Sequence, residues 1–161
     1  MTITLRPITR GNFRTVLDLT LHPGQEKFVA ANAVSIANAY VEPTFVPLAV
    51  YAGDDLVGFA MYGQHPKTGA WWVIRLMIDR KHQGKGYGRA AMEALIAIMD
   101  ERVGCEEIVT SFVSANTVAA NLCASLGFCP TSEIEDGEPL VSKVEGRLFV
   151  LLKRVGWRPE E

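Results

Sequence analysis

The sequence predicts a single α/β domain built on a mixed β-sheet. Strand-like and helix-like segments follow one another in the order βααβββαβαββ, as judged from the period of the apolar residues. A glycine-rich turn at residues 83–89 joins the most apolar strand to an amphipathic helix. The chain has 161 residues, of which 48% are hydrophobic and 21% charged, so it can bury one sizeable core and is not of the disordered class.

The N-terminal part supplies one strand and two helices. Residues 3–8 alternate apolar and polar side chains and predict the first strand. The first helix begins at Thr9 or Asn12, and its apolar stripe consists of Phe13, Val16, Leu17 and Leu21. Residues 22–25, which include Pro23 and Gly24, end this helix. Residues 28–41 predict a second helix, rich in alanine and able to pack closely against a neighbour.

Three strands come next. Residues 46–52 and 56–62 predict a hairpin around the turn Gly53-Asp54-Asp55. Residues 71–79 form a near-continuous apolar run, which is typical of a central strand buried on both faces.

The C-terminal part alternates helix and strand. The helix predicted over residues 87–102 has one apolar face, made of Met92, Leu95, Ile96 and Met99. A strand at residues 107–113 leads to a helix that begins at Asn116 and ends at Gly127. Residues 128–134, a turn at Asp136-Gly137 and a last strand at residues 147–153 complete the predicted sheet, and residues 154–161 are expected to be a frayed tail.

Composition excludes several classes of protein. The net charge is −2, from 16 basic and 18 acidic residues without a basic block, which argues against nucleic acid as a partner. The first residues lack the apolar core of a signal peptide, so none is expected, and no apolar run reaches the ~18 residues of a membrane span. The three cysteines, Cys105, Cys123 and Cys129, lack metal-site spacing. We expect a cytoplasmic protein without a membrane partner or a metal.

The glycine-rich turn predicts a phosphate site. Glycines let a backbone approach a ligand closely, and a helix start presents unpaired N–H groups and a dipole that favours an anion. Gly84-Lys85-Gly86-Tyr87-Gly88 has the spacing GxGxG, so it is neither the dinucleotide fingerprint GxGxxG nor the Walker loop GxxxxGK.

Two motifs carry a resemblance to a known family. Gln-x-x-Gly-x-Gly, with Gln83, Gly86 and Gly88, follows a strand, and some 30 residues later comes a helix with Asn116, Ala119, Leu122 and Gly127-Phe128. Together they resemble the GNAT superfamily of acyl-CoA-dependent N-acyltransferases. The resemblance implies the GNAT fold over residues 1–153: a mixed, mostly antiparallel sheet of about seven strands, flanked by four helices and splayed at the central strand. Residues 154–161 would be the C-terminal tail.

The resemblance also implies an acetyl-CoA site, with acetyl-CoA as co-substrate. Residues that would bind the CoA pyrophosphate are Gln83, Gly84, Lys85, Gly86, Tyr87, Gly88 and Arg89. The backbone of Leu76, Met77 and Ile78 would pair with the pantetheine arm as an added strand, and Asn116 would contact it. The N–H group of Met77 or Ile78 is the expected donor to the oxyanion.

The acid and the base are less well defined. Many family members have a tyrosine general acid where this chain has Cys123, which could donate a proton, act through a water molecule, or be a small buried residue. Some relatives have a glutamate base where this chain has Trp72. The remaining acid–base candidates are Glu42, His65, Asp79 and Glu26.

Within the superfamily the chain looks like bacterial spermine/spermidine (diamine) acetyltransferases. The segments that carry this similarity are residues 57–63, Trp72-x-x-Arg75-x-x-Ile78-Asp79 and Gln25-x-x-Phe28-Val29-Ala30-x-Asn32. This implies transfer of an acetyl group to a primary amine, a polyamine or diamine, by direct attack. Two alternatives stay open, a protein or peptide N-acetyltransferase and a non-catalytic acyl-CoA-binding module. A homodimer is also open.

Two kinds of side chain are expected near the acceptor: aromatic residues that could line its slot, and an arginine with a structural role. The aromatic candidates for the acceptor slot are Tyr40, Tyr62, Trp71 and Trp72, although aromatic residues at such positions are more often core. Arg75 is expected to be structural, with its guanidinium spanning backbone carbonyls.

Overall fold

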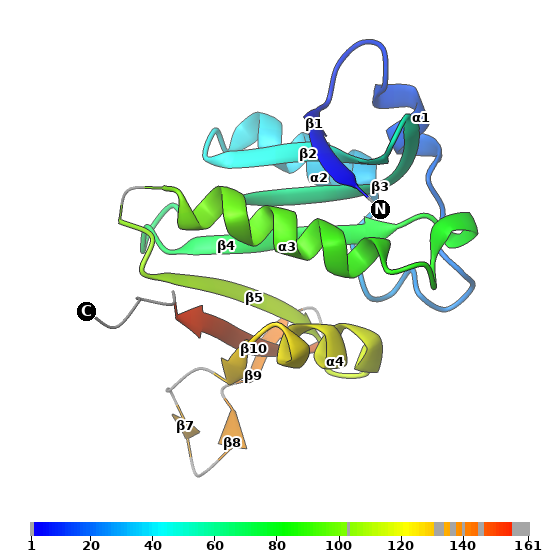
Figure 1. Ribbon diagram of the computed structural model, residues 1–161. Coiled ribbons are helices and arrows are strands. Elements are labelled where there is room, and N and C mark those ends of the chain that lie inside the picture. The colour runs from blue at the N-terminus through cyan, green and yellow to red at the C-terminus, as the bar shows by residue number, and fades with distance from the viewer. Residues whose placement is uncertain are drawn as a thin grey trace.

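The computed structural model describes residues 2–102, 104–130, 134–135, 138–139, 141–144 and 147–155. It is a twisted sheet with helices on both faces (Figure 1). The helices are α1 (Phe13–Asp18), α2 (Asn32–Val41), the short 3₁₀ helix η1 (Arg80–His82), α3 (Tyr87–Asp100) and α4 (Thr117–Ser125). The strands are β1 (Ile3–Pro7), β2 (Phe45–Ala52), β3 (Asp55–Gln64), β4 (Trp71–Ile78), β5 (Glu107–Val113), β6 (Cys129–Pro130), β7 (Ile134–Glu135), β8 (Glu138–Pro139), β9 (Val141–Val144) and β10 (Arg147–Val155).

The main sheet has the strand order β1-β2-β3-β4-β5-β10-β6, and β9 also pairs with β10. Its pairs are antiparallel except for β4 and β5, which confirms the predicted mixed, mostly antiparallel sheet. The prediction of about seven strands is slightly wrong, because the described sheet has eight. β6 and β9 pair with different parts of β10, so two short strands share the last position across the sheet. Among the residues that the structure describes, β7 and β8 pair only with each other.

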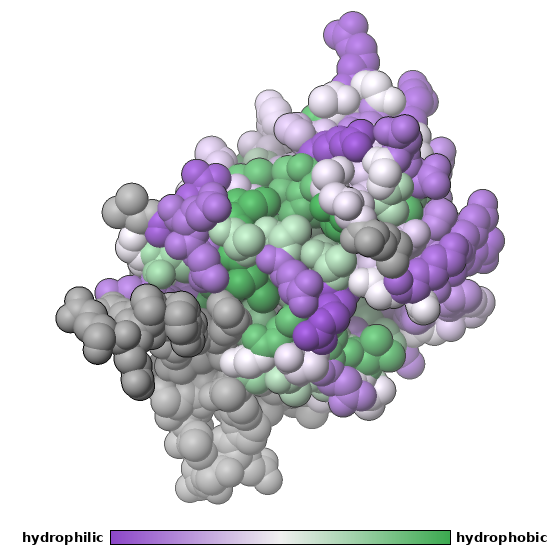
Figure 2. Space-filling view, in the orientation of Figure 1, coloured by the Kyte–Doolittle hydropathy of each residue, from purple (hydrophilic) through white to green (hydrophobic). Residues whose placement is uncertain are grey.

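The two faces of the sheet carry different helices. α3 packs on one face, where its buried residues are the predicted Met92, Leu95, Ile96 and Met99 together with Ala91. Cys123 of α4 joins the same cluster. Val16 of α1 and Ile36 of α2 pack on the other face, against side chains such as Phe59 and Met61 of β3. On the face that carries α3, apolar side chains gather in the middle and reach the surface, with hydrophilic ones along the upper and right edges (Figure 2).

The sheet opens between its two central strands. β4 pairs with β5 only from Trp71 to Val73, opposite Ile108 to Thr110. Beyond Val73, β4 stays paired with β3 as far as Ile78, whereas β5 pairs with β10 from Glu107 to Val113. The strands therefore diverge in a V whose narrow end is at Val73, and the predicted splay at the central strand is confirmed.

Both N-terminal helices are shorter than predicted. α1 ends at Asp18 because Leu19 is extended, so Leu21 lies outside the helix. α2 begins at Asn32 rather than at residue 28, and Ala31 at its N-cap is extended. The buried amide of Asn32 donates to the carbonyl of Val16 at 2.9 Å, which holds the helix start against α1. Residues 28–31 therefore belong to the segment that leads into α2.

The boundaries of the C-terminal elements also differ from those predicted. β10 continues through Val155, two residues into the segment expected to be a frayed tail. The predicted turn at Asp136-Gly137 lies outside the described residues.

Candidate functional site

A cavity of about 630 Å³ fills the V between β4 and β5. One wall is β4 from Val73 to Ile78 and the opposite wall is β5 from Thr110 to Val113. The start of α3, the start of α4 and the segment between α1 and α2 close the remaining sides. Apolar strand residues thus line its middle, and helix N-termini lie at its rim. A cavity of this size and lining is typical of a small-molecule site.

The glycine-rich turn forms one end of the cavity. Gly84 and Gly86 have φ values of 76° and 82°, a left-handed conformation that favours glycine. Gly86 is the N-cap of α3, and no side chain caps this helix start. The N–H groups of the first turn are therefore available to an anion. Gly84, Gly88 and Arg89 line the cavity, whereas Lys85, Gly86 and Tyr87 do not.

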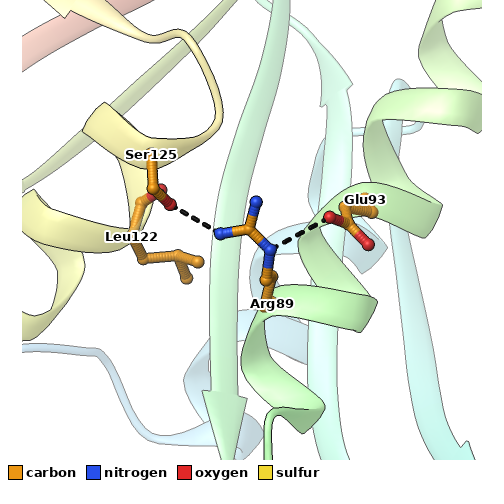
Figure 3. Close-up of polar contacts among 4 residues, drawn as sticks. All are labelled: Arg89, Glu93, Leu122 and Ser125. Atoms are coloured by element: carbon orange, nitrogen blue, oxygen red, sulfur yellow. Dashed lines mark hydrogen bonds and ion pairs between the residues drawn. The ribbon is translucent and has the colours of Figure 1, made fainter. Parts of the chain in front are cut away.

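Arg89 points from α3 toward α4 at this end (Figure 3). Its Nη1 donates to the hydroxyl of Ser125 at 2.7 Å, and its Nε lies 3.2 Å from the carboxylate of Glu93. Ser125 in turn donates to the carbonyl of Leu122. These contacts hold the guanidinium in place, and Nη2 has no contact in the described part of the chain and is available to a phosphate.

The register of β4 decides which backbone groups face the cavity. The N–H of Asp79 donates to the carbonyl of Val57 on β3. Because antiparallel pairs alternate, the N–H of Met77 also points toward β3, opposite Phe59, and those of Leu76 and Ile78 point toward the opened side. Of the two N–H groups predicted as donors to the oxyanion, that of Ile78 faces the opened side and that of Met77 points toward β3. The carbonyl of Ile78 already accepts from Nε2 of Gln83 at 3.0 Å.

Gln83 helps to hold the wall of the cavity. Its amide exchanges two hydrogen bonds with the amide of Gln25, at 2.9 and 3.2 Å. The buried carboxylate of Asp79 accepts from the N–H groups of Thr20 and Lys81, at 2.8 and 3.0 Å. Both contacts tie the segment between α1 and α2 to the end of β4. Gln83, predicted as a ligand contact, lines the cavity, and its side-chain amide is hydrogen-bonded within the protein.

Asn116 and Cys123 both line the cavity from α4. The side-chain oxygen of Asn116 accepts from the N–H of Ala119 at 3.2 Å, so it caps the helix and leaves its amide nitrogen as a donor. The thiol of Cys123 is only 3% exposed. Burial raises the pKa of this thiol to about 11.

The three residues predicted as catalytic do not come together. Glu42 caps the C-terminus of α2, lines neither cavity described here, and accepts from the hydroxyl of Thr44 at 3.0 Å. His65 lies at a second, smaller cavity, with Nδ1 accepting from the N–H groups of Lys67 and Thr68. Of the three, only Cys123 lines the larger cavity. Of the other acid–base candidates, Glu26 is exposed and Asp79 is structural.

Among the predicted aromatic residues only Trp72 lines either cavity in the described part of the chain. Tyr40 is 88% exposed. Tyr62 is buried and stacks with Trp71, with ring centroids 6.3 Å apart. The core alternative is therefore the better description of Tyr62 and Trp71.

The smaller cavity, of about 160 Å³, shares lining residues with the larger one at the narrow end of the V, and this shared region is called the junction below. Residues that line both cavities are Val73, Ile74, Arg75 and Ser111. The β3–β4 register shifts between Met61 and Tyr62, so Ile74 is an extra residue on β4 at this point. The buried hydroxyl of Thr110 donates to the carbonyl of Val73 at 3.2 Å and fixes where the strands part.

Thr110 and Ser111 were not predicted as site residues. They lie in a strand whose sequence shows only a mixture of apolar and polar residues. In the described part of the chain no cluster of three or more His, Cys, Asp or Glu side chains could hold a metal ion. Nor does that part contain a helix with the length and apolar character needed to cross a membrane.

Known proteins resemble this chain over most of its length. Residues 14–128 match the model of the acetyltransferase (GNAT) family. A spermine/spermidine N(1)-acetyltransferase of Bacillus subtilis (strain 168) is 33% identical over 150 residues, which cover 89% of this chain and 99% of the relative.

Solved structures share the fold. A spermidine N-acetyltransferase from Vibrio cholerae, in complex with CoA and spermine, superposes with a TM-score of 0.71 at 15% identity, covering 95% of each chain. A Bacillus subtilis acetyltransferase in complex with CoA has a TM-score of 0.67 at 14% identity, covering 96% of this chain and 98% of the other.

Proposed function

The chain belongs to the acetyltransferase (GNAT) family, and on this premise we propose that it moves the acetyl group of acetyl-CoA to a primary amine of a polyamine or diamine. The observation that carries the proposal is the V-shaped cavity between β4 and β5, with the glycine turn and the start of α3 at its wide end. A curated relative at 33% identity is a spermine/spermidine acetyltransferase, which supports the acceptor class. The free thiols of Cys105 and Cys123 fit a reducing compartment, so we place the protein in the cytoplasm.

In this proposal the wide end of the V binds the pyrophosphate of acetyl-CoA. The first-turn N–H groups of α3 and the free nitrogen of Arg89 donate to it. The pantetheine arm runs along β4 toward Val73 and pairs with the backbone of Leu76 and the N–H of Ile78. Asn116 donates to it from the opposite wall through its amide nitrogen. The thioester then lies near Ile74 and Arg75, where the two cavities meet.

The acceptor amine attacks the thioester carbonyl directly. A nitrogen–carbon bond forms, the tetrahedral oxyanion collapses, and the carbon–sulfur bond breaks with its electron pair going to sulfur. The N–H of Ile78, predicted as the oxyanion donor, pairs with the pantetheine arm in this proposal, so a backbone N–H of β4 nearer to Ile74 would stabilise the oxyanion. The alkyl thiolate is a good leaving group, since its conjugate acid has a pKa of about 8.5.

Cys123 does not act as the general acid in this mechanism. Its pKa of about 11 lies above that of the departing thiol, so proton transfer from Cys123 to the thiolate is uphill. We expect Cys123→Ala to lower kcat by less than about threefold, because a small apolar residue fills most of the same space. The measurement is steady-state thiol release with acetyl-CoA.

The matched control for this prediction is Cys105→Ala, which removes a thiol outside both cavities. If Cys123→Ala turned over more slowly than wild type by a factor on the order of 100, with CoA binding intact, the thiol would take part in the chemistry.

The acceptor class is tested by a panel. We expect thiol release from acetyl-CoA with spermidine, spermine and shorter diamines, and kcat/KM at least about tenfold higher for these than for amino acids, aminoglycosides or peptides. A preference for peptides would make the chain a peptide N-acetyltransferase. CoA binding by calorimetry with no release for any amine would make it a non-catalytic acyl-CoA-binding module.

A further inference from the structure

Arg75 occupies the junction of the two cavities. It follows the extra residue Ile74 on β4 and lines the larger cavity, where the donor is proposed to lie, and the smaller one on the other side of the narrow end. Ser111 faces the same junction from β5. A group entering from the smaller cavity meets the thioester beside this side chain.

The charge of Arg75 has no acidic partner in the described part of the chain. Nη1 donates to the carbonyl of Ile74 at 2.8 Å, and Nε is buried without a hydrogen-bond partner. Burial lowers the pKa of this guanidinium, yet arginine stays protonated at neutral pH. A half-buried cation without a counter-charge is unfavourable for folding. Its place at the junction points to a role with the substrate.

No described side chain at the junction is a ready base for the amine. A primary ammonium has a pKa of about 10.4, and only its neutral form attacks a thioester. His65 uses Nδ1 to accept the N–H groups of Lys67 and Thr68, so this nitrogen is already engaged within the protein. Cys123 is a protonated thiol on α4. The other titratable groups of the cavities, His82 and Arg89, face the donor end, and no described lining residue is a carboxylate.

Building on the proposed function, we propose that the positive charge of Arg75 favours the neutral, nucleophilic form of the acceptor amine where the two cavities meet. A like charge within about 4–6 Å disfavours the ammonium form and shifts its pKa by roughly one to three units. One proton passes from the ammonium to water before attack. The second leaves the nitrogen as the tetrahedral intermediate collapses, and water or the departing thiolate accepts it. Arg75 itself exchanges no proton.

The test is kcat against pH for thiol release from saturating acetyl-CoA with spermidine, which reports ionisation in the bound complex. In Arg75→Met the acidic limb of the profile should move up by about one to three pH units, so that kcat at pH 7 falls about 10- to 1000-fold and recovers toward pH 10. Arg75→Lys keeps a charge and should keep the limb within about half a unit. The surface variant Arg14→Met removes the same charge from α1, outside both cavities, and should leave the profile in place.

Two further measurements separate the effect of Arg75→Met on folding from its effect on the bound amine. Removing an unpaired buried charge should leave the thermal midpoint of Arg75→Met unchanged or raise it by about 2–4 °C. Calorimetric titration of spermidine into the protein–CoA complex at pH 9, in two buffers of different ionisation enthalpy, counts the protons released. Wild type should release about 0.2 to 0.9 protons more than Arg75→Met, the range that follows from a pKa shift of one to three units.

Two results would overturn the inference. A kcat that falls equally at every pH in Arg75→Met, or an equal proton count in both proteins, would show that Arg75 acts by position alone, with the proposed function intact. If wild type neither binds nor acetylates any amine of the panel, the proposed function fails and this inference fails with it.

Discussion

Replacing Gly84 with Asp is expected to weaken CoA binding on the order of 100-fold. Gly84 lines the donor end of the cavity, and a Cβ added there meets no atom within 4 Å, so the new carboxylate projects into open space. A single charge about 5 Å from a phosphate, at an effective dielectric constant of about 20, repels it by about 3 kcal/mol. Each 1.4 kcal/mol is tenfold in Kd. Calorimetric titration with CoA measures the change.

Two variants separate charge from backbone strain. Gly84→Asn has the same shape without the charge, and asparagine tolerates a left-handed backbone better than most residues, so we expect a loss of about tenfold or less. Gly104→Asp adds the same side chain at a matched φ of 79°, also in open space but outside the cavity, and should bind CoA like wild type. Equal affinity for wild type and Gly84→Asp would show that the glycine turn does not hold the pyrophosphate.

The glycine turn could be predicted because its information is local. Glycines at alternate positions, a preceding apolar run and a following amphipathic segment all lie within residues 71–102. The strand at residues 107–113 is likewise local and has the predicted bounds. The glycine turn at the proposed donor site can therefore be predicted from one stretch of sequence and its two flanks.

The walls of the cavity could not be predicted in the same way, because they are assembled from distant segments. The point where β4 and β5 part depends on pairing between Val73 and Thr110, 37 positions apart. The wall formed by residues 19–31 is held by contacts such as Gln25 with Gln83, and α2 begins at Asn32 although a helix was predicted from residue 28. Propensity describes an isolated segment, and these contacts do not exist in one.

Arg75 shows the limit for a single residue. Arg75 was predicted to be structural, with its guanidinium spanning backbone carbonyls, and its Nη1 does donate to one backbone carbonyl. That Nε is buried without a partner, beside two cavities, depends on the whole three-dimensional arrangement. In the sequence, Arg75 stands out only as a charged residue in an apolar strand and as part of the segment Trp72-x-x-Arg75-x-x-Ile78-Asp79.

Removing the carboxylate of Asp79 should cost about 2–3 kcal/mol of unfolding free energy at neutral pH. The side chain is 6% exposed, and in Asp79→Ala the N–H groups of Thr20 and Lys81 lose their acceptor. A hydrogen bond to a charged group contributes about 1.5–3 kcal/mol, and because Thr20 and Lys81 are exposed, water compensates part of the loss of the two bonds. Urea unfolding gives the difference. Asp18→Ala, an exposed aspartate at the end of α1, should stay within about 0.5 kcal/mol of wild type.

The stabilisation by Asp79 should depend on pH in a definite direction. Burial alone would raise the pKa of Asp79, but the N–H groups of Thr20 and Lys81 and the nearby charges of His82 and Lys81 outweigh it and hold the pKa below its ordinary value. A carboxyl with a lowered pKa in the folded state stabilises the protein above its unfolded pKa of about 3.9 and loses that effect as pH falls through the folded value. The gap between wild type and Asp79→Asn should therefore be constant from about pH 5 to 8 and shrink below about pH 4.

The same carboxylate links stability to the site. Thr20 is held twice at the end of β4, by Asp79 and by the N–H of Arg80, which donates to its carbonyl at 2.8 Å. The following residues Leu21, Gln25 and Phe28 line the cavity. In Asp79→Ala we expect amide hydrogen exchange to rise first in residues 20–31, before the core of β3 and α3, because this segment has lost its anchor. Uniform acceleration across the chain would contradict a local anchor and leave Asp79 with a global role in stability alone.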